Sequence, residues 1–345
     1  MLLYIHIPFC DSKCGYCAFA SFVAPTSLHA PYFAALHREL DHRLAPHMRF
    51  SSLFVGGGTP NVVNESFYIP LLERLLPYLR NDCELSMELN PNHLTSHFIA
   101  TIRALGFNRI SLGAQSFCKQ KLKWLMRKHE PQSIFAACDN LYRAGFTNLN
   151  VDVIYNTPFD SYDNLVFEAQ NLAKLPLNHV SAYALSIEEG STFFAEGRRA
   201  ANDGEELCKL LANLGFAQYE VSNYARNDKY CQHNLGYWQH KDYLGIGASA
   251  VSFCSQQRTR STNAKTLRDY LANPLWQDVE ILNAQDVRFE QLFLGLRCCY
   301  GAPKAQCNAQ NLQIALQENL VHCENERVVA NNFFLADSLA LFLES

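Results

Sequence analysis

The chain has 345 residues, of which 48% are hydrophobic and 18% charged, a composition typical of a folded protein with one large core and room for a smaller second unit. Its 29 basic and 33 acidic residues leave a formal charge of −4, which offers no general attraction to nucleic acid or anionic lipid. Charges or prolines interrupt every stretch that approaches the roughly 20 apolar residues of a membrane-spanning helix. Because the first residues also lack a basic leader and a cleavage site, we expect a cytoplasmic protein.

Six β-rich runs alternate with helical patterns over the first half of the chain. The expected strands are Leu2–Ile7, Ser52–Gly56, Leu85–Leu89, Arg109–Gly113, Asn148–Tyr155 and His179–Leu185. The expected helices are Pro31–Leu44, Ser66–Leu79, Leu94–Leu105, Gln132–Ala144 and Asp163–Leu175, with Gly106 and Gly145 where helices end. This alternation predicts an α/β fold, a partial (β/α)6 barrel of the TIM type with a lateral opening.

After residue 200 the pattern changes. We expect a helix over Glu205–Leu214, a strand over Gln218–Tyr224 and, from about residue 280, two helices, a hairpin over Leu320–Val329 and a final helix. This order is that of a small winged-helix-like α/β module. From Glu280 onward eight acidic residues outnumber four basic ones, which argues against DNA binding. The expected domains are 1–225 and 226–345.

Thirteen cysteines are many for a protein of a reducing compartment, where thiols stay free or bind metals. Three of them, Cys10, Cys14 and Cys17, fall within eight residues directly after the first expected strand. A structural zinc site needs a fourth ligand, which His6 or a distant cysteine would have to supply. A [4Fe–4S] cluster on exactly three thiolates instead leaves one iron open to an exchangeable ligand.

The stretch YIHIPFCDSKCGYC resembles the signature of radical S-adenosylmethionine (SAM) proteins. The blocks GGGTPN, SMELNPN, RISLGAQSF, GFTNLNVDVIY, HVSAYAL and YEVSNYA…HNLGYW…YLGIGASAVSF are similar, in order, to those of the coproporphyrinogen III dehydrogenase-like branch, over nearly the full length. The resemblance implies a [4Fe–4S] cluster on Cys10, Cys14 and Cys17, with SAM on the open iron. It leaves open whether SAM is cleaved.

Polar residues at the strand ends match what SAM would need. The resemblance implies that the glycine-rich turn with Gly57, Gly58 and Thr59 lets the backbone approach the methionine amine of SAM. Glu88 and Asp152 can accept hydrogen bonds from the ammonium and the ribose hydroxyls. The further SAM residues that we expect are Arg127 for the carboxylate, Gln115 as a neutral partner, and Tyr4 and Tyr16 beside the cluster.

Within this branch the sequence separates two functions. The dehydrogenase resembles C-x3-C-x2-C-x-C, whereas this chain has Phe19 at the position of the fourth cysteine, as in the haem-chaperone (HemW-like) group. The segment with His233, Asn234, Tyr237 and Trp238 matches the HNxxYW motif associated with haem in that group. It offers an imidazole and aromatic faces for a macrocycle.

Cys231 and His240 are further candidate haem ligands. Where the branch usually reads YGLPGQ, this chain has YNTPFD over 155–160, so backbone contacts at 156–157 need not carry over. We expect a haem chaperone that binds a [4Fe–4S] cluster, SAM and haem. The alternatives are an oxygen-independent coproporphyrinogen III oxidase and a catalytically silent interaction protein with a structural cluster.

The expected partners are a haem-acceptor protein and an electron donor for the cluster. Nucleic acid and a membrane span are not expected, and peripheral association with a membrane stays open.

Overall fold

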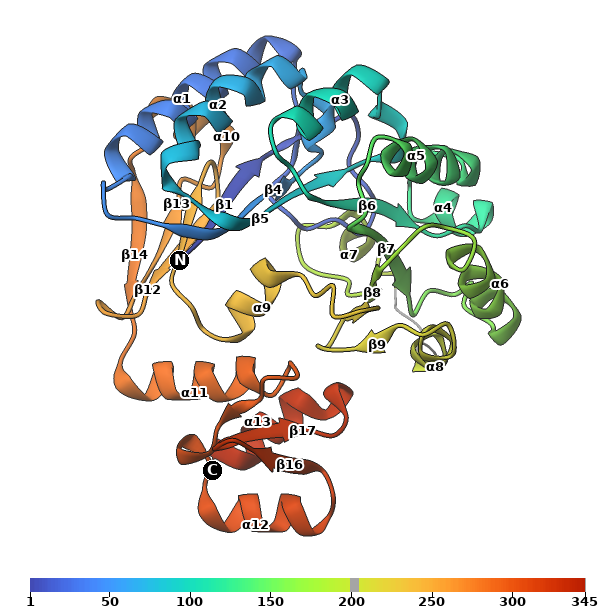
Figure 1. Ribbon diagram of the computed structural model, residues 1–345, viewed down its shortest axis with the longest axis vertical. Helices are drawn as coiled ribbons and strands as arrows, with labels where there is room; N and C mark the ends of the chain where they lie inside the picture. The colour runs from blue at the N-terminus through green and yellow to red at the C-terminus, as the bar shows by residue number, and fades with distance from the viewer. Residues whose placement is uncertain (199–204, 345) are drawn as a thin grey trace.

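One curved sheet organises the computed structural model, which describes residues 1–198 and 205–344 (Figure 1). Its centre consists of parallel strands that follow one another in chain order: β1 (Leu2–Ile7), β4 (Phe50–Gly57), β5 (Leu79–Leu89), β6 (Arg109–Gln115), β7 (Leu149–Tyr155) and β8 (His179–Ala184). Each expected strand is present within a few residues of its expected ends, except that β5 begins six residues earlier, at Leu79. The predicted partial barrel is confirmed.

Helices cover the outer face of this sheet. They are α1 (His29–Arg43), α2 (Tyr68–Leu75), α3 (Ser96–Ala104), α4 (Lys119–Trp124), α5 (Pro131–Arg143) and α6 (Tyr162–Leu172). The predicted helix over Ser66–Leu79 is too long, because a 3-10 turn containing Pro77 follows α2 and Leu79 already begins β5. Gly106 and Gly145 both have a φ of +89°, as the predicted helix ends require.

Strands beyond the six extend the sheet at both edges. β11 (Tyr243–Ile246) pairs parallel with β1, and β12 (Val251–Cys254), β13 (Thr259–Asn263) and β14 (Gln277–Ile281) follow antiparallel. At the other edge, β10 (Asn223–Ala225) and β9 (Ala217–Gln218) form a hairpin beside β8. The predicted single strand Gln218–Tyr224 is therefore wrong. Buried Glu220 accepts a hydrogen bond from the Ser222 N–H, which holds the turn between the two strands.

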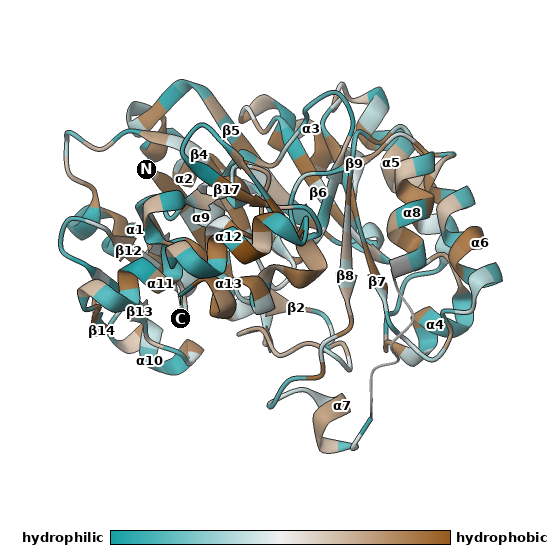
Figure 2. Ribbon diagram, turned by 90° about the horizontal axis from the view of Figure 1, so that it is seen from below, coloured by the Kyte–Doolittle hydropathy of each residue, from teal (hydrophilic) through white to brown (hydrophobic). Residues whose placement is uncertain are grey.

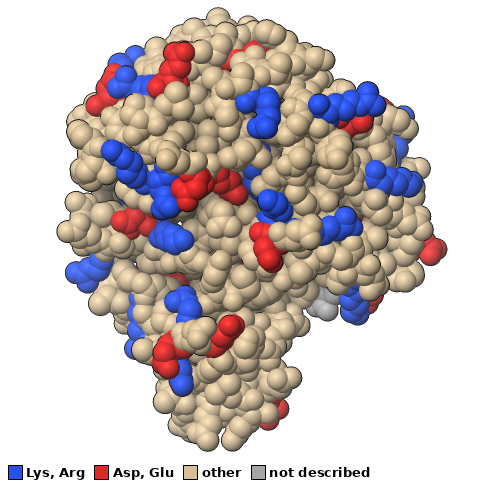
Figure 3. Space-filling view, in the orientation of Figure 1, with Lys and Arg blue, Asp and Glu red and all other residues tan. Residues whose placement is uncertain are grey.

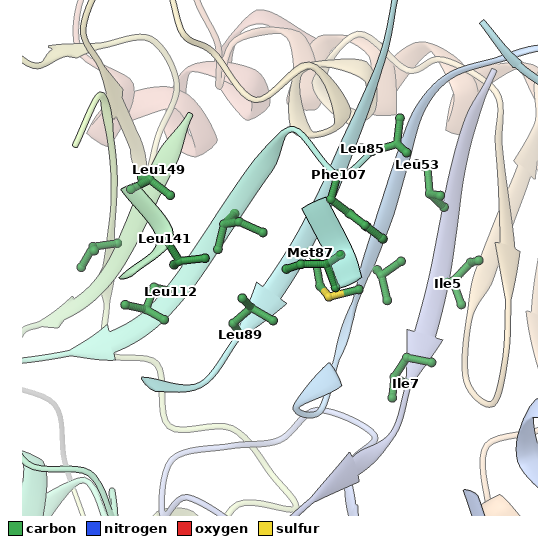
Figure 4. Close-up of a cluster of buried hydrophobic side chains, with 14 of the residues drawn as sticks. Ile5, Ile7, Leu53, Leu85, Met87, Leu89, Phe107, Leu112, Leu141 and Leu149 are labelled. Carbon is green, nitrogen blue, oxygen red and sulfur yellow. The ribbon is translucent and has the colours of Figure 1, made fainter. Parts of the chain in front are cut away.

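The sheet has one apolar and one polar face because side chains alternate along each strand. The large core lies on the helix side, where Figure 4 shows Ile5 of β1, Leu53 of β4, Met87 of β5 and Leu112 of β6 as parts of one buried cluster. Apolar residues likewise concentrate on the strands and on the helix sides turned toward them (Figure 2). The inner face of the curved sheet is left to polar residues.

The last sixty residues form a unit that hangs below the sheet in Figure 1. It contains α11 (Ala284–Gly295), β15 (Ala302–Pro303), α12 (Ala309–Gln317), β16 (Val321–Glu324), β17 (Arg327–Ala330) and α13 (Ala336–Glu344). The expected order of helix, helix, hairpin and helix is present, and these elements share a separate buried core. The sheet itself continues past residue 225 through β11, so the division at 225/226 stays a prediction.

Four short helices complete the described chain: α7 (Thr192–Ala195), α8 (Glu205–Asn213), α9 (Gln232–Trp238) and α10 (Leu267–Ala272). Across residues 1–198 and 205–344, no helix has both the length and the apolar character needed to cross a bilayer. On the face shown in Figure 3, basic and acidic side chains are interspersed.

Candidate functional site

The three cysteines of the predicted cluster lie on one loop at the carboxyl end of β1. The short strand β2 (Phe9–Cys10) pairs with β3 (Phe22–Val23), and the loop between them carries Cys14 and Cys17. This loop lies at the same end of the molecule as α7 (Figure 2), and the Phe193 N–H donates to the Gly15 carbonyl at 2.9 Å. All three cysteines are free, half-buried and line a cavity of about 400 Å³.

Hydrogen-bond donors surround these thiols. The Sγ of Cys10 lies 3.5 Å from the Thr59 hydroxyl, and the Sγ of Cys17 lies 3.8 Å from the Ser21 hydroxyl. The Arg127 guanidinium donates from Nη1 to the Sγ of Cys14 at 3.3 Å. Burial raises the pKa of the Cys10 thiol, and the hydrogen bond with Thr59 opposes this shift. Iron binds cysteine in its thiolate form.

Three free thiols on one loop are a donor set that fits an iron–sulfur cluster. No group of three or more His, Cys, Asp or Glu side chains within residues 1–198 and 205–344 is arranged to hold one ion. A cubane needs a wider arrangement, because each of its thiolates binds a different iron. His6, the nearby alternative as a fourth zinc ligand, is instead held between the Tyr4 hydroxyl at 3.0 Å and the Ala20 carbonyl at 2.8 Å.

The predicted glycine-rich turn follows β4 and forms one wall of the same cavity. Gly57 has a φ of +113°, and its N–H donates to the Glu88 carboxylate at 3.0 Å. At Gly58 a Cβ would lie 2.6 Å from the Phe9 carbonyl oxygen, so only glycine lets the turn pack against the cluster strand. Thr59 follows directly and contacts Cys10.

Glu88 and Asp152 bring two buried carboxyl groups to this cavity from β5 and β7. Burial, together with the neighbouring charge of Asp152, raises the pKa of Glu88 to about 7. Burial also raises the pKa of Asp152, although hydrogen bonds from Ser111 and Asn150 oppose this shift. A cationic group of a ligand placed between these two buried carboxyl groups would favour their charged forms.

Three of the residues expected to bind SAM, Arg127, Gln115 and Tyr16, line this cavity. Gln115 has a φ of +67° at a bulge in β6, which turns its side chain out of the regular alternation. The Arg127 guanidinium donates to the Gly113 carbonyl at 2.6 Å. Tyr16 packs against a small apolar cluster that contains Leu125 and Phe193. Tyr4 lines a second, adjacent cavity instead.

The HNxxYW segment forms α9, and only some of its residues line a cavity. The second cavity, of about 790 Å³, is lined by Tyr237 and by the downstream His240. His233 is 1% exposed, and its two ring nitrogens contact the Ser52 hydroxyl at 2.8 Å and the Tyr237 hydroxyl at 2.9 Å.

The remaining haem candidates lie away from both cavities. The Trp238 ring packs with Tyr219 and Leu235, and the Arg297 guanidinium lies over it. Asn234 is half-buried. Cys231 is fully buried, and burial raises the pKa of its thiol to about 12, which disfavours the thiolate needed for iron.

Sequence reasoning missed a buried polar layer on the inner face of the sheet. The Asn150 amide donates to Ser111, Asp152 and Ser181, and the His179 ring contacts the Asn150 side-chain oxygen at 2.6 Å. These bonds orient Asp152. The signal was present as polar residues at every second position of otherwise apolar strands.

The partial barrel, the three-cysteine loop and the cavity over the strand ends are those of a radical SAM protein, and the radical SAM superfamily model matches residues 4–170. The solved coproporphyrinogen III oxidase (HemN) from Escherichia coli, described as a radical SAM enzyme, aligns with a TM-score of 0.82 and 23% identity. This alignment covers 100% of this chain and 90% of that one.

Curated relatives narrow the family further. Heme chaperone HemW of Mycobacterium tuberculosis H37Rv is 34% identical over 95% of this chain and 90% of its own length. Heme chaperone HemW of Escherichia coli K12 is 31% identical over 96% and 90%. The chain therefore belongs to the HemW family within the radical SAM superfamily.

Proposed function

We propose that this chain is a haem chaperone on a radical SAM scaffold, which binds haem and delivers it to an acceptor protein. The observation that carries the proposal is its similarity to proteins named heme chaperone HemW, at 34% identity over 90% of the relative's length. Phe19 supports it, because this exposed aromatic side chain stands at the cavity where the dehydrogenase branch has a fourth cysteine. The likeness to HemN concerns the fold.

Three cofactors belong to this proposal. Cys10, Cys14 and Cys17 would hold the [4Fe–4S] cluster, and the first cavity would take SAM between Glu88, Asp152 and Arg127. A reduced cluster held on these thiolates would supply an electron to bound SAM. The chain's own residues orient the ligand, keep two carboxyl groups out of water and place Arg127 against the Cys14 thiol. The proposed location is the cytoplasm, with an electron donor as a second partner.

One anaerobic preparation tests the function. The cluster is reconstituted, hemin is titrated into the protein, and coproporphyrinogen III is incubated with protein, SAM and a reductant. We expect stoichiometric haem binding and no divinyl product. Formation of vinyl groups would overturn the chaperone proposal in favour of the oxidase, and an absence of haem binding would also overturn it.

The cluster ligands are tested in the same preparation by iron content. Cys17→Ala should reduce the reconstituted iron from about four atoms per chain to a small fraction, because two thiolates hold a cubane poorly. Cys254→Ala is the matched control, since Cys254 is also half-buried but lies on β12. Equal iron in both variants would remove Cys17 from the ligand set.

A further inference from the structure

The second cavity is the larger of the two that border the cluster loop, and its walls come from distant parts of the chain. Tyr4, Tyr237 and Tyr243 line it from the sheet and from α9, while Phe289 and Phe293 line it from α11. Its volume of about 790 Å³ lies in the range of sites that enclose an organic ligand. Aromatic walls with few polar groups suit a flat, apolar macrocycle.

We infer that haem lies in this second cavity and that His240, rather than the motif residue His233, is the side chain that ligates its iron. This inference rests on the proposed haem-chaperone function and names the site at which that function takes place.

His240 has the geometry of a supported metal ligand. It follows the end of α9 with a φ of +56°, and its ring packs against Phe253 with centroids 4.3 Å apart. Its Nε2 lies 3.1 Å from the Glu290 carboxylate on α11. Ligating histidines generally donate their second ring N–H to a carboxylate, which fixes the ring and raises its basicity. Nδ1 is then the nitrogen that meets the iron.

Arg260 completes this arrangement from β13. Its guanidinium binds Glu290 and also lies 3.1 Å from Glu280, so it keeps the Glu290 carboxylate in place. Glu290 and Arg260 are therefore positioning residues. They act on the iron through the orientation and the basicity of His240.

His233 has no ring nitrogen free to bind iron. Its two ring nitrogens are engaged by Ser52 on β4 and by the Tyr237 hydroxyl, and the ring is enclosed between Tyr4 and Phe54. Its contact with the Tyr237 hydroxyl positions Tyr237, which lines the second cavity. The motif histidine thus shapes the aromatic wall and does not reach the metal.

The two cavities share Phe19, Gly57 and Glu88 along their border. The proposed haem site therefore adjoins the proposed SAM site, and one aromatic side chain, Phe19, faces both ligands.

The ligand assignment is tested by hemin titration of the full chain with the cluster reconstituted, followed by absorption and electron paramagnetic resonance spectra. Glycine accepts the positive φ at this position, so His240→Gly removes the imidazole with little backbone cost. We expect at least about a tenfold weaker affinity and loss of the histidine-ligated spectrum, both restored by added imidazole. His322→Asn, on β16 in the C-terminal unit, is the control and should behave as the parent chain.

Two further variants separate ligand from positioning roles. Glu290→Gln should keep the histidine-ligated spectrum but raise the reduction potential of the bound haem, because a weaker acceptor makes the imidazole a poorer donor. His233→Gln should weaken binding and leave the ligand signature unchanged. If His240→Gly keeps the parent spectrum while His233→Gln loses it, the assignment is overturned.

The outcomes separate the assignment of His240 as ligand from the proposed haem-chaperone function. A parent chain that fails to bind hemin overturns the proposed function. A parent chain that binds hemin with the same affinity and spectrum as His240→Gly overturns only the ligand assignment.

Discussion

At the scale of single residues, Glu88 shows how position changes the chemistry of a common side chain. In water its carboxyl group would be charged at neutral pH, but burial and the nearby Asp152 raise its pKa to about 7. The Gly57 N–H partly offsets this shift by donating to the carboxylate. A cationic ligand placed between the two carboxyl groups would favour the charged form of Glu88.

The raised pKa predicts a pH dependence of ligand binding. Below pH 7 the empty site takes up a proton that a cation must displace, so SAM affinity should fall by up to about tenfold per pH unit. Glu88→Gln should bind SAM more weakly at pH 8 and show a flatter profile between pH 6 and 8. Isothermal titration calorimetry of the reconstituted protein measures both. Parallel profiles would show that Glu88 is not the titrating group.

The same pKa has a consequence for folding, with the opposite slope. Because the folded chain holds a proton that the unfolded chain releases near pH 4.5, this group lowers stability as pH rises from about 4.5 to 7. Without ligand, Glu88→Gln should therefore reduce that loss of stability in chemical denaturation.

At the scale of elements, a buried ion network joins three segments of the chain. Lys121 on α4 donates to Asp160 in the loop after β7 at 2.5 Å and lies 3.9 Å from Glu168 on α6. Glu168 accepts from the Phe117 N–H after β6, and Asp160 accepts from the Thr157 N–H. The network therefore supports both the Gln115 bulge and the YNTPFD loop, in which the chain departs from its branch.

Removal of the single cation should destabilise this region strongly. Lys121→Met leaves two buried carboxyl groups without their partner, which costs about 3–5 kcal/mol in the free energy of unfolding. Lys119→Met on the same helix breaks only the exposed pair with Glu130 and should cost less than about 1 kcal/mol. Urea denaturation of both variants measures the difference. Similar values for the two would show that the buried network contributes little.

At the scale of the whole molecule, the second cavity exists because the C-terminal unit packs against the sheet. The polypeptide reaches α11 after β14, the edge strand, and α11 then lies beside α9 (Figure 1). Residues of both helices line the cavity. Two contacts of Glu290 on α11, one with His240 and one with Arg260, join the C-terminal unit to the rest of the chain. Neither unit alone encloses the space.

A substitution on α11 should therefore affect haem and spare the cluster. Phe289→Ala removes an aromatic wall and is expected to weaken hemin binding about tenfold, while iron content and SAM binding stay unchanged. Gln285→Ala, at an exposed position of the same helix, is the control. Fluorescence quenching by hemin gives the affinities. A loss of cluster iron in Phe289→Ala would contradict two separable sites.

The three-cysteine loop and the six parallel strands could be predicted because their signals are local. Three cysteines on one loop need no distant partner to be recognised, and alternation or 3.6-residue periodicity marks each strand or helix. Short elements were less predictable. The Gln218–Tyr224 run reads as one strand, yet buried Glu220 turns it into a hairpin, and that burial depends on packing against the segment around Cys298.

The sequence by itself determined the scaffold, the three-cysteine loop and the branch of the family, through residues whose roles depend on their immediate neighbours. Only the tertiary structure decided which motif residues face a cavity. His233 and His240 lie seven positions apart and look alike in the sequence, but Ser52 encloses the first and Glu290 supports the second. Those partners come from β4 and α11, and only the folded chain brings them to α9.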